Sequence, residues 1–354
     1  MQPAPTPPSL AHLASRVDER LRLLLEAERA RWTAFDPDLA DPIGEIGRLV
    51  LAGGKRLRPA FAFWGFVGAG GDPDDPGVVD AGAAFELMHA FALFHDDVMD
   101  DATSRRGEVT THTKFAHQHE SERWAGEARR FGDGVAILVG DLAFVYADQL
   151  MIGASPQAWA IWNELRVELN IGQVLDILGG VRNDRRRDKA ERICRYKSGK
   201  YTVERPLHLG AVMAAPDRQA ELLPALSAYG LPLGDAFQMR DDVMGAFGDE
   251  QLTGKAVGGD LREGKPTPLL ARAVEAASVA QRAVLDTVGR PDLTDADVAS
   301  IQQVIVDTGA LADLERTISS LTDEALVAID KAAITDGARD ELVQLAHYVS
   351  WRHA

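Results

Sequence analysis

The sequence predicts an all-α fold built as one large helical bundle. Apolar residues recur at three- and four-residue spacing along most of the 354 residues, which is the period of an amphipathic helix. Alternating runs of β-branched residues bounded by turns, the pattern of a strand, are missing from the sequence. No break between helical segments is long or biased enough to serve as an interdomain linker. We therefore predict a single domain over residues 11–354, preceded by a disordered tail over residues 1–10.

The helical period is clearest in four segments, residues 10–32, 135–151, 162–180 and 340–353. The most apolar segment, residues 78–94, contains Asp80, Glu86 and His89, so we predict a buried helix rather than a membrane span. Breaks between helices are expected at residues 68–77, 102–133, 183–188 and 248–268. The second and fourth breaks are rich in Gly, Arg, Lys and Asp, and loops on a rigid scaffold are where functional residues concentrate.

The composition excludes several classes of partner. The formal charge is 38 − 54 = −16, which disfavours binding to nucleic acid or to an anionic membrane. The first ten residues have neither the basic nor the apolar region of a signal peptide. Cys194 is the single cysteine, which excludes an internal disulfide and favours a reducing compartment. We expect a cytoplasmic protein with no nucleic-acid partner and no transmembrane segment.

The tetrapeptide DDVM occurs twice, beginning at Asp96 and at Asp241. On a helix, Asp96 and Asp100 share a face, and so do Asp97 and Asp101. Like charges stacked in this way repel, so a cation should offset them, and carboxylate oxygens suit Mg²⁺. A lone DDxxD match in an acidic chain more often marks a solvated helix end. Here the motif interrupts the most apolar helix, recurs, and leads both times into a basic loop, so the pattern favours a metal site.

The second copy departs from DDxxD because residue 245 is Gly. The next acid, Asp249, would lie about 10 Å beyond Asp242 on an uninterrupted helix, so we do not count it as a ligand. Gly245 and Gly248 allow the chain to bend there, and a contribution of Asp249 through water stays open.

Basic residues cluster in four Gly- or Ser-containing segments. These segments are GGKRLRP with Lys55 and Arg58, SRRG with Arg105 and Arg106, YKSGKY with Lys197, Ser198 and Lys200, and TGKAVGGDLREGKPTP with Lys255 and Lys265. Taken singly, each is more often a surface charge. Together, beside acidic metal motifs, they suggest two diphosphates, one held through Mg²⁺ and one held by basic side chains. The pattern GxxxxGK[ST] is absent, so a nucleotide-binding P-loop is not indicated.

Six segments in one order carry a family resemblance: GGKRLRP, LMHAFALFHDDVMD, RRG, YKSGKYT, FQMRDD and GKAVGGDLREGK, over about residues 40–270. The chain resembles the polyprenyl synthetase family of trans-isoprenyl diphosphate synthases, in particular geranylgeranyl diphosphate synthases of the actinobacterial type. Shorter-chain actinobacterial members often have Gly at the position of Gly245. The resemblance implies an isoprenoid-synthase bundle with a central substrate cavity, a requirement for Mg²⁺, and a homodimer. It also implies condensation of isopentenyl diphosphate with dimethylallyl, geranyl or farnesyl diphosphate.

The resemblance further implies roles for individual residues. Mg²⁺ is bound by Asp96, Asp100 and Asp241, with Asp97 and Asp242 beside them. The allylic diphosphate is held by Arg105, Lys197, Ser198, Gln238, Lys255 and Lys265. Isopentenyl diphosphate is held by Lys55, Arg58, His89 and Arg106. Taken alone, His89 is more often a satisfied buried histidine. It lies seven residues before Asp96 on nearly the same helical face, which supports its ligand role independently. Gln173 and Asp176 share another helix face, which either lines the cavity or forms a polar helix edge.

The resemblance also implies that residues just before the first acidic motif set the product length. By resemblance, an aromatic residue five positions before Asp96, here Phe91, forms the floor of the product pocket. With small Ala92 beside it, the pattern resembles enzymes that stop at twenty carbons. A helical wheel disagrees, since it places Phe91 about 140° from Asp96 and Ala92 only about 40° away.

Three other functions stay open. The same chemistry could give a farnesyl or a longer product. A class I terpene cyclase shares the acidic metal motif but needs no isopentenyl site, so Lys55, Arg58, His89 and Arg106 argue against it. A weakly catalytic regulatory subunit is opposed by the intact first motif, although Gly245 keeps it open.

Overall fold

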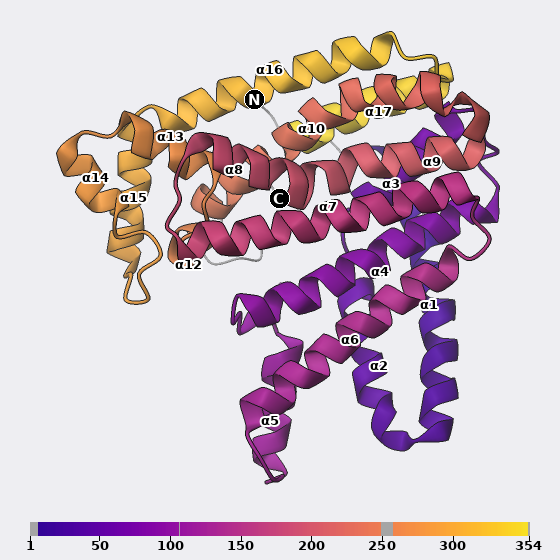
Figure 1. The fold of residues 1–354 in the computed structure, drawn as a ribbon, viewed down its shortest axis with the longest axis horizontal. Helices are drawn as coiled ribbons and strands as arrows, with labels where there is room; N and C mark the ends of the chain where they lie inside the picture. Colours follow the sequence, from indigo (N-terminus) through magenta and orange to yellow (C-terminus); the bar gives the residue numbers. More distant parts are fainter. Residues whose placement is uncertain (1–5, 106, 249–257, 353–354) are drawn as a thin grey trace. The chain divides into compact units, whose positions relative to one another are not determined.

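The structure, a computed structural model, describes residues 6–105, 107–248 and 258–352 (Figure 1). The chain divides into two compact units. The N-terminal unit contains Pro8–Phe63 and Asp72–Ser155, and the C-terminal unit contains Trp64–Gly71 and the chain from Pro156 onward. Helices make up nearly all of the regular structure in the described residues, so the predicted all-α class is confirmed.

The N-terminal unit is built around one buried helix. Its elements are α1 (Pro8–Phe35), η1 (Pro37–Leu39), α2 (Ala40–Leu51), the first half of α3 (Leu57–Gly68), α4 (Pro76–Met99), β1 (Ser104–Arg105), β2 (Glu108–Val109), α5 (Thr111–Ser121) and α6 (Ala128–Leu150). Helix α4 packs against α1, α2 and α6. Asp75 caps its first turn by accepting the N–H of Gly77 at 2.7 Å, and Pro76 follows at the position where proline is best tolerated.

Helix α4 contains the segment that was predicted to be buried, and Phe85, Leu87 and Met88 have no exposed surface (0%). Of the described helices, α4 alone is long and apolar enough to cross a membrane, and 67% of its most apolar window is buried inside the protein. A core helix passes the same test of length and composition, so this is weak evidence for a membrane span.

A short antiparallel hairpin follows α4, in a segment where no strand was predicted. Ser104 of β1 lies opposite Val109 of β2, and Arg105 lies opposite Glu108. Gly107 has φ +78°, which the turn requires and which glycine adopts without steric cost. The two-residue strands leave the fold class unchanged, but they fix the position of Arg105 after the first acidic motif.

The C-terminal unit is a helical bundle around α10. Its elements are the second half of α3, α7 (Pro156–Val181), α8 (Arg187–Ile193), η2 (Cys194–Glu204), α9 (Arg205–Ala214), η3 (Pro216–Arg218), α10 (Gln219–Phe247), α12 (Gly259–Glu263), α13 (Pro268–Ala276), α14 (Val279–Leu285), α15 (Asp295–Asp307), α16 (Ala310–Asp330) and α17 (Asp336–Ser350). Helix α10 packs against η2, α9, α16 and α17. The segment η2 is a π-helix, a rare geometry that occurs frequently at functional sites.

The start of the chain differs from the prediction. Helix α1 begins at Pro8 and Leu10 is buried, so the tail expected over residues 1–10 does not include Pro8–Leu10. Leu10 belongs to the apolar stripe that continues through Leu13 and Val17, and burying that stripe favours helix up to the proline. The single domain expected over residues 11–354 stays a prediction.

Candidate active site

The first acidic motif lies where α4 ends. The helix stops at Met99, and the N–H of Asp100 still donates to the carbonyl of Asp96 at 2.8 Å, so these two residues are one turn apart as predicted. Asp101 has φ +52° and is exposed, whereas Asp97 is buried. The predicted shared face of Asp97 and Asp101 is wrong, because the chain has left the helix at Asp101.

Arg105 binds the carboxylates of this motif directly. Its Nε donates to Asp97 Oδ1 at 2.6 Å and its Nη2 to Asp96 Oδ2 at 3.4 Å. Burial raises the pKa of Asp97 to about 6; the Arg105 guanidinium opposes that rise, and the neighbouring Asp96 carboxylate adds to it. The hairpin therefore places Arg105, which was predicted to hold the allylic diphosphate, against Asp96 and Asp97, which were predicted to take part in metal binding.

Three more predicted residues, His89, Phe91 and Ala92, lie on α4 and are partly exposed. The ring of Phe91 packs against Phe144 of α6 and against His95, with centroids 4.9 and 4.7 Å apart. Phe91 therefore lies on the side of α4 that contacts α6, and its role as a pocket floor stays a prediction.

The three basic residues of the segment GGKRLRP differ in how deeply they are buried. Lys55 and Arg58, predicted to hold isopentenyl diphosphate, are partly exposed, whereas Arg56 between them is buried. Arg56 donates to the Val50 carbonyl and Glu86 at 2.5 Å each and to Asp18 at 2.8 Å. Sequence reasoning missed this anchor, although Glu86 inside an apolar helix signalled a buried cationic partner.

The second acidic motif lies near the end of α10. Asp241 is partly exposed, and Asp242 is buried. Gln238 donates to Asp242 Oδ1 at 2.9 Å, and Asp242 Oδ2 has no hydrogen-bond partner among the described residues. Burial, together with the nearby Asp260 and Asp241 carboxylates, raises the pKa of Asp242 well above its usual range.

Gly245 leaves room for a carboxylate from another helix. A Cβ built at Gly245 would overlap the carboxylate of Asp260 on α12. Lys265, predicted to hold the allylic diphosphate, has its Nζ 4.0 Å from Asp260 Oδ1 and 2.5 Å from Glu263. Sequence reasoning did not select Asp260, although the missing acid at residue 245 was a reason to look for an acid from another element.

The donor chemistry fits a hard divalent cation such as Mg²⁺. Each unit offers clustered carboxylates, and the unpartnered oxygen of buried Asp242 is the kind of group that a cation would satisfy. Within the described residues, no group of three or more His, Cys, Asp or Glu side chains converges as in a closed metal site. Mg²⁺ usually keeps waters and takes one or two protein carboxylates plus substrate phosphates, so the residues present suffice.

Lys197 is carried by the π-helix and contacts α7. Its Nζ donates to Asp176 Oδ2 at 2.5 Å. The sequence left open whether Asp176 lines the cavity or belongs to a polar helix edge, and in the structure it pairs with Lys197. Gly172 of α7 lies against the backbone of Lys197, where a Cβ would overlap the main chain. Ser198 on the same turn is partly exposed.

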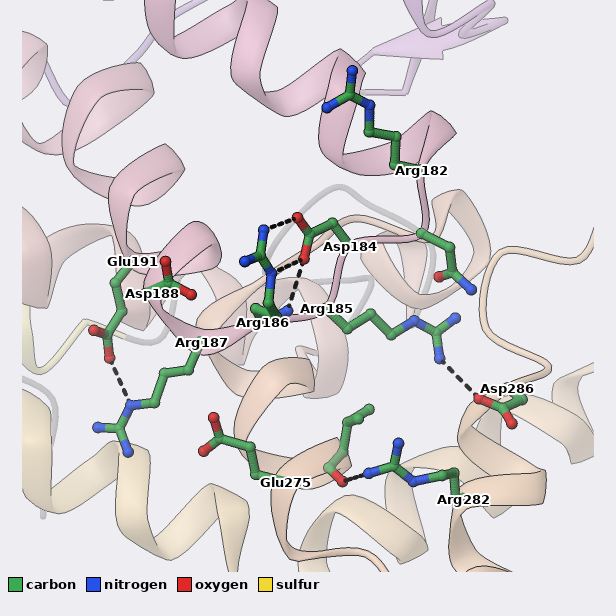
Figure 2. Close-up of a pocket in the computed structure, with 12 residues that line it drawn as sticks. Arg182, Asp184, Arg185, Arg186, Arg187, Asp188, Glu191, Glu275, Arg282 and Asp286 are labelled. Atoms are coloured by element: carbon green, nitrogen blue, oxygen red, sulfur yellow. Dashed lines mark hydrogen bonds and ion pairs between the residues drawn. The ribbon is translucent and has the colours of Figure 1, made fainter.

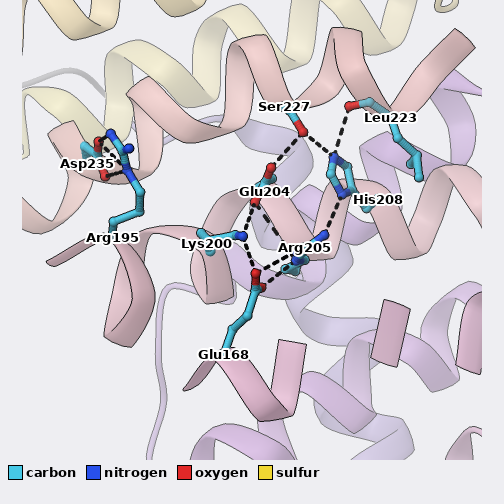
Figure 3. A network of polar contacts seen from close by, with 9 residues as sticks. All are labelled: Glu168, Arg195, Lys200, Glu204, Arg205, His208, Leu223, Ser227 and Asp235. Atoms are coloured by element: carbon cyan, nitrogen blue, oxygen red, sulfur yellow. Dashed lines mark hydrogen bonds and ion pairs between the residues drawn. The ribbon is translucent and has the colours of Figure 1, made fainter. Parts of the chain in front are cut away.

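A buried polar network supports this segment (Figure 3). Glu168 of α7 accepts from Lys200 and from Arg205, the latter at 2.6 and 2.7 Å. Ser227 of α10 joins Glu204 at 2.7 Å and His208 at 3.1 Å. Burial lowers the pKa of His208 to about 3, and the Arg205 charge acts in the same direction. Lys200 is thus engaged in the scaffold.

A pocket of about 910 Å³ lies along the segment NDRRRD in the C-terminal unit (Figure 2). None of the predicted site residues that the structure describes lines it. Four of the five arginines that line it bond to neighbouring groups, as in the pairs of Arg186 with Asp184 at 2.7 Å and Arg187 with Glu191 at 2.9 Å. This pocket is a salt-bridged surface and is not the candidate active site. Arg106 and Lys255 lie outside the described residues.

Comparison with known proteins identifies a single family. The sequence profile named polyprenyl synthetase matches residues 42–306. A geranylfarnesyl diphosphate synthase of Aeropyrum pernix is 32% identical over 84% of this chain and 89% of its own length. A (2E,6E)-farnesyl diphosphate synthase of Mycobacterium tuberculosis is 30% identical over 98% of this chain and 90% of its own length. The crystal structure of a geranylgeranyl pyrophosphate synthase from Corynebacterium glutamicum, complexed with isoprenyl diphosphate and magnesium, has 35% identity and a TM-score of 0.90, covering 96% of this chain and 99% of that one.

Proposed function

This chain belongs to the polyprenyl synthetase family, which makes it a prenyltransferase that joins isoprenyl diphosphates head to tail, and we propose that its product is geranylgeranyl diphosphate. Its substrates are then isopentenyl diphosphate and an allylic diphosphate with five to fifteen carbons. A farnesyl or longer product is the alternative, since relatives named farnesyl, geranylfarnesyl and nonaprenyl diphosphate synthase also match.

The observation that carries this proposal is the pairing of acidic and basic motifs within each unit. In the N-terminal unit, Arg105 bonds to Asp96 and Asp97. In the C-terminal unit, Lys265 lies beside Asp260, which fills the space at Gly245 of the second motif. Carboxylates that hold a cation, next to cations that hold phosphate, are what an isoprenyl diphosphate requires.

We assign metal binding to Asp96, Asp100 and Asp241, supported by Asp97 and Asp242. A bound Mg²⁺ would neutralise the diphosphate and stabilise the charge that develops as it leaves the allylic carbon. The proposed allylic diphosphate ligands are Arg105, Lys197, Ser198, Gln238, Lys255 and Lys265. The proposed isopentenyl diphosphate ligands are Lys55, Arg58, His89 and Arg106.

The protein's own groups bind, orient and exclude water. Guanidinium groups bind phosphate oxygens with two parallel donors, and Lys197 offers an ammonium charge from the π-helix. The allylic carbon loses its bond to the diphosphate oxygen and gains a bond to the isopentenyl double bond, and the departing diphosphate takes up the proton that is then lost. Apolar helix walls must exclude water, which would otherwise convert the allylic cation to an alcohol.

We also propose a cytoplasmic homodimer. Exposed apolar residues of α7 follow the four- and three-residue spacing of a helix–helix seam, at Val167, Ile171, Val174, Leu178 and Val181. Exposed apolar surface of this kind marks interaction sites, and we assign this one to a second copy of the chain. The single cysteine, Cys194, is free and buried, which suits a reducing compartment.

The test is an incubation with Mg²⁺, dimethylallyl diphosphate and isopentenyl diphosphate, followed by measurement of product chain length. We expect a twenty-carbon diphosphate. Asp96→Asn and Asp241→Asn should each lower turnover at least about 100-fold, as does the loss of one transition-state contact. Asp323→Asn, which changes an exposed carboxylate on α16, is the matched control and should retain wild-type turnover.

A fifteen-carbon or longer product would replace the proposed chain length and leave the enzyme class intact. A cyclic hydrocarbon, or no condensation in a folded protein, would contradict the class itself. Near-normal turnover of Asp96→Asn at saturating Mg²⁺ would contradict the assignment of the metal ligands.

A further inference from the structure

The last described residue, Arg352, reaches the second acidic motif. Its guanidinium Nη2 donates to Asp241 Oδ1, and the same group donates to the carbonyls of Val349 at 2.6 Å and Phe237 at 3.3 Å. It also lies 4.1 Å from the centroid of the Phe237 ring. The side chain is 3% exposed, whereas that of Asp241 is 39% exposed. Arg352 is therefore a fixed part of the C-terminal unit that presents its charge to one accessible carboxylate.

A second arginine, on α10, bonds to the end of α17. Arg240, next to Asp241 on α10, donates to the Ser350 carbonyl at 2.8 Å and to Glu315 at 2.7 and 2.6 Å. Its guanidinium lies 5.5 Å from the centroid of the Trp351 ring. The ends of α10 and α17 are joined by reciprocal arginine contacts, so Arg352 cannot leave Asp241 without disrupting this junction.

The placement of Arg352 leaves one of its own groups unsatisfied. Its Nε is buried and has no hydrogen-bond partner among the described residues. A buried donor without a partner costs free energy, so the hydrogen bonds of the two terminal nitrogens are made at the expense of Nε. What the position does achieve is a permanent positive charge at Asp241, because a guanidinium stays protonated at any ordinary pH.

Two effects of that charge on cation binding oppose each other. Because Arg352 binds one carboxylate oxygen of Asp241, it fixes the orientation of this side chain. A fixed orientation favours the binding of a cation to the other oxygen. The guanidinium also repels a divalent cation, and for charges that share one carboxylate this repulsion amounts to about tenfold in affinity even in the dielectric of water. Orienting a single short carboxylate gains much less than this, because few rotamers are removed. Repulsion is therefore the larger effect.

We propose that Arg352 is a built-in counter-cation of Asp241, which weakens the binding of a divalent metal ion to the second acidic motif in the absence of diphosphate. The proposal rests on the proposed metal-binding role of Asp241. Because the Asp241–Arg352 pair has no net charge, a free cation gains little there. A diphosphate adds the negative charge that the pair lacks, so the metal ion binds there together with its substrate and not before it.

The test measures Mn²⁺ binding to the substrate-free full chain by the electron paramagnetic resonance signal of free Mn²⁺. Arg352→Gln should bind Mn²⁺ about tenfold more tightly than the wild type, whereas Arg352→Lys, which keeps the charge, should stay near the wild type. Arg316→Gln on α16 removes an exposed arginine, with the same change in net charge, and should have no effect. Helical circular dichroism checks the fold, and Arg352→Met replaces Arg352→Gln if the latter does not fold.

The double variant Asp241→Asn/Arg352→Gln separates this proposal from the function on which it rests. In the Asp241→Asn background, Arg352→Gln should have no further effect on Mn²⁺ affinity, because the shared carboxylate is gone. Unchanged or weaker Mn²⁺ binding in Arg352→Gln alone overturns the counter-cation role while leaving the metal site in place. Tighter Mn²⁺ binding in Arg352→Gln that persists when Asp241→Asn is added overturns both.

Discussion

At the scale of single residues, the lack of a side chain at Gly245 is explained by the carboxylate of Asp260. The altered second motif looks like a loss when only the sequence is considered, but the Asp260 carboxylate occupies the space that a side chain at residue 245 would need. The position is therefore closed to larger residues, and an acid from α12 lies where the motif has none.

Gly245→Ala should lower the free energy of unfolding by about 1–3 kcal/mol, because the new methyl group forces Asp260 to shift inside a packed junction. The measurement is a urea unfolding curve followed by circular dichroism. Gly259→Ala, where a Cβ meets nothing within 4 Å among the described residues, is the control and should be neutral or slightly stabilising. Equal stabilities of the two variants would show that Asp260 moves away freely.

Phe91 and Ala92 decide between two interpretations of chain length. The ring of Phe91 packs against Phe144, so Phe91→Ala opens space beside α6, and we expect products longer than twenty carbons. Ala92→Phe adds volume at a partly exposed position and should shorten the product toward fifteen carbons. Chromatography of the dephosphorylated products measures both. If only Ala92→Phe shifts the product length, the helical wheel is right that Ala92 faces the pocket, and the resemblance is wrong that Phe91 forms its floor.

Placements that follow from local spacing could be predicted, and contacts with partners distant in sequence could not. The one-turn separation of Asp96 and Asp100 follows from helical spacing, and the structure keeps it. Arg56, Asp260 and Arg352 were missed because their partners Glu86, Gly245 and Asp241 come from other elements. No local pattern encodes those pairings.

At the scale of elements, amphipathic helices followed directly from the apolar period, but the π-helix did not. The segment predicted as helix over residues 162–180 lies within α7. A π-helix changes the number of residues per turn without a distinct composition, so η2 could not be recognised from the sequence. Helix α5 was missed inside the predicted break at 102–133, because its buried face includes the polar residues His112 and His119.

The contact of α7 with η2 predicts the effect of a single methyl group. Gly172→Ala would overlap the backbone of Lys197, so we expect η2 to shift and turnover to fall at least about tenfold, with a loss of about 1–3 kcal/mol in stability. Steady-state kinetics and urea unfolding measure the two effects. Gly180→Ala on the same helix, where a Cβ meets nothing within 4 Å among the described residues, should keep wild-type activity. Equal activity of both variants would show that the close contact of Gly172 with Lys197 does not position Lys197 for the reaction.

At the scale of the whole molecule, composition limits where the chain can associate. A net charge of −16 opposes self-association over most of the surface, so a dimer needs a locally apolar contact. The exposed stripe on α7, from Val167 to Val181, supplies one in the C-terminal unit. Its spacing was visible in the sequence, but only the structure shows that these side chains are exposed, because the same period also describes a buried face.

Val174→Asp should convert the proposed homodimer to a monomer. The substitution puts a charge in the middle of the α7 stripe, and removing that charge from water at a helix–helix contact costs more than the lost apolar contact alone. Light scattering coupled to size exclusion measures the mass, with twice the chain mass expected for the wild type and one chain for the variant. Val327→Asp on α16 introduces the same charge at a residue that is 58% exposed, compared with 52% for Val174, so it controls for charge and exposure together. A dimer that persists in Val174→Asp, or that is lost equally in Val327→Asp, would place the contact elsewhere on the molecule.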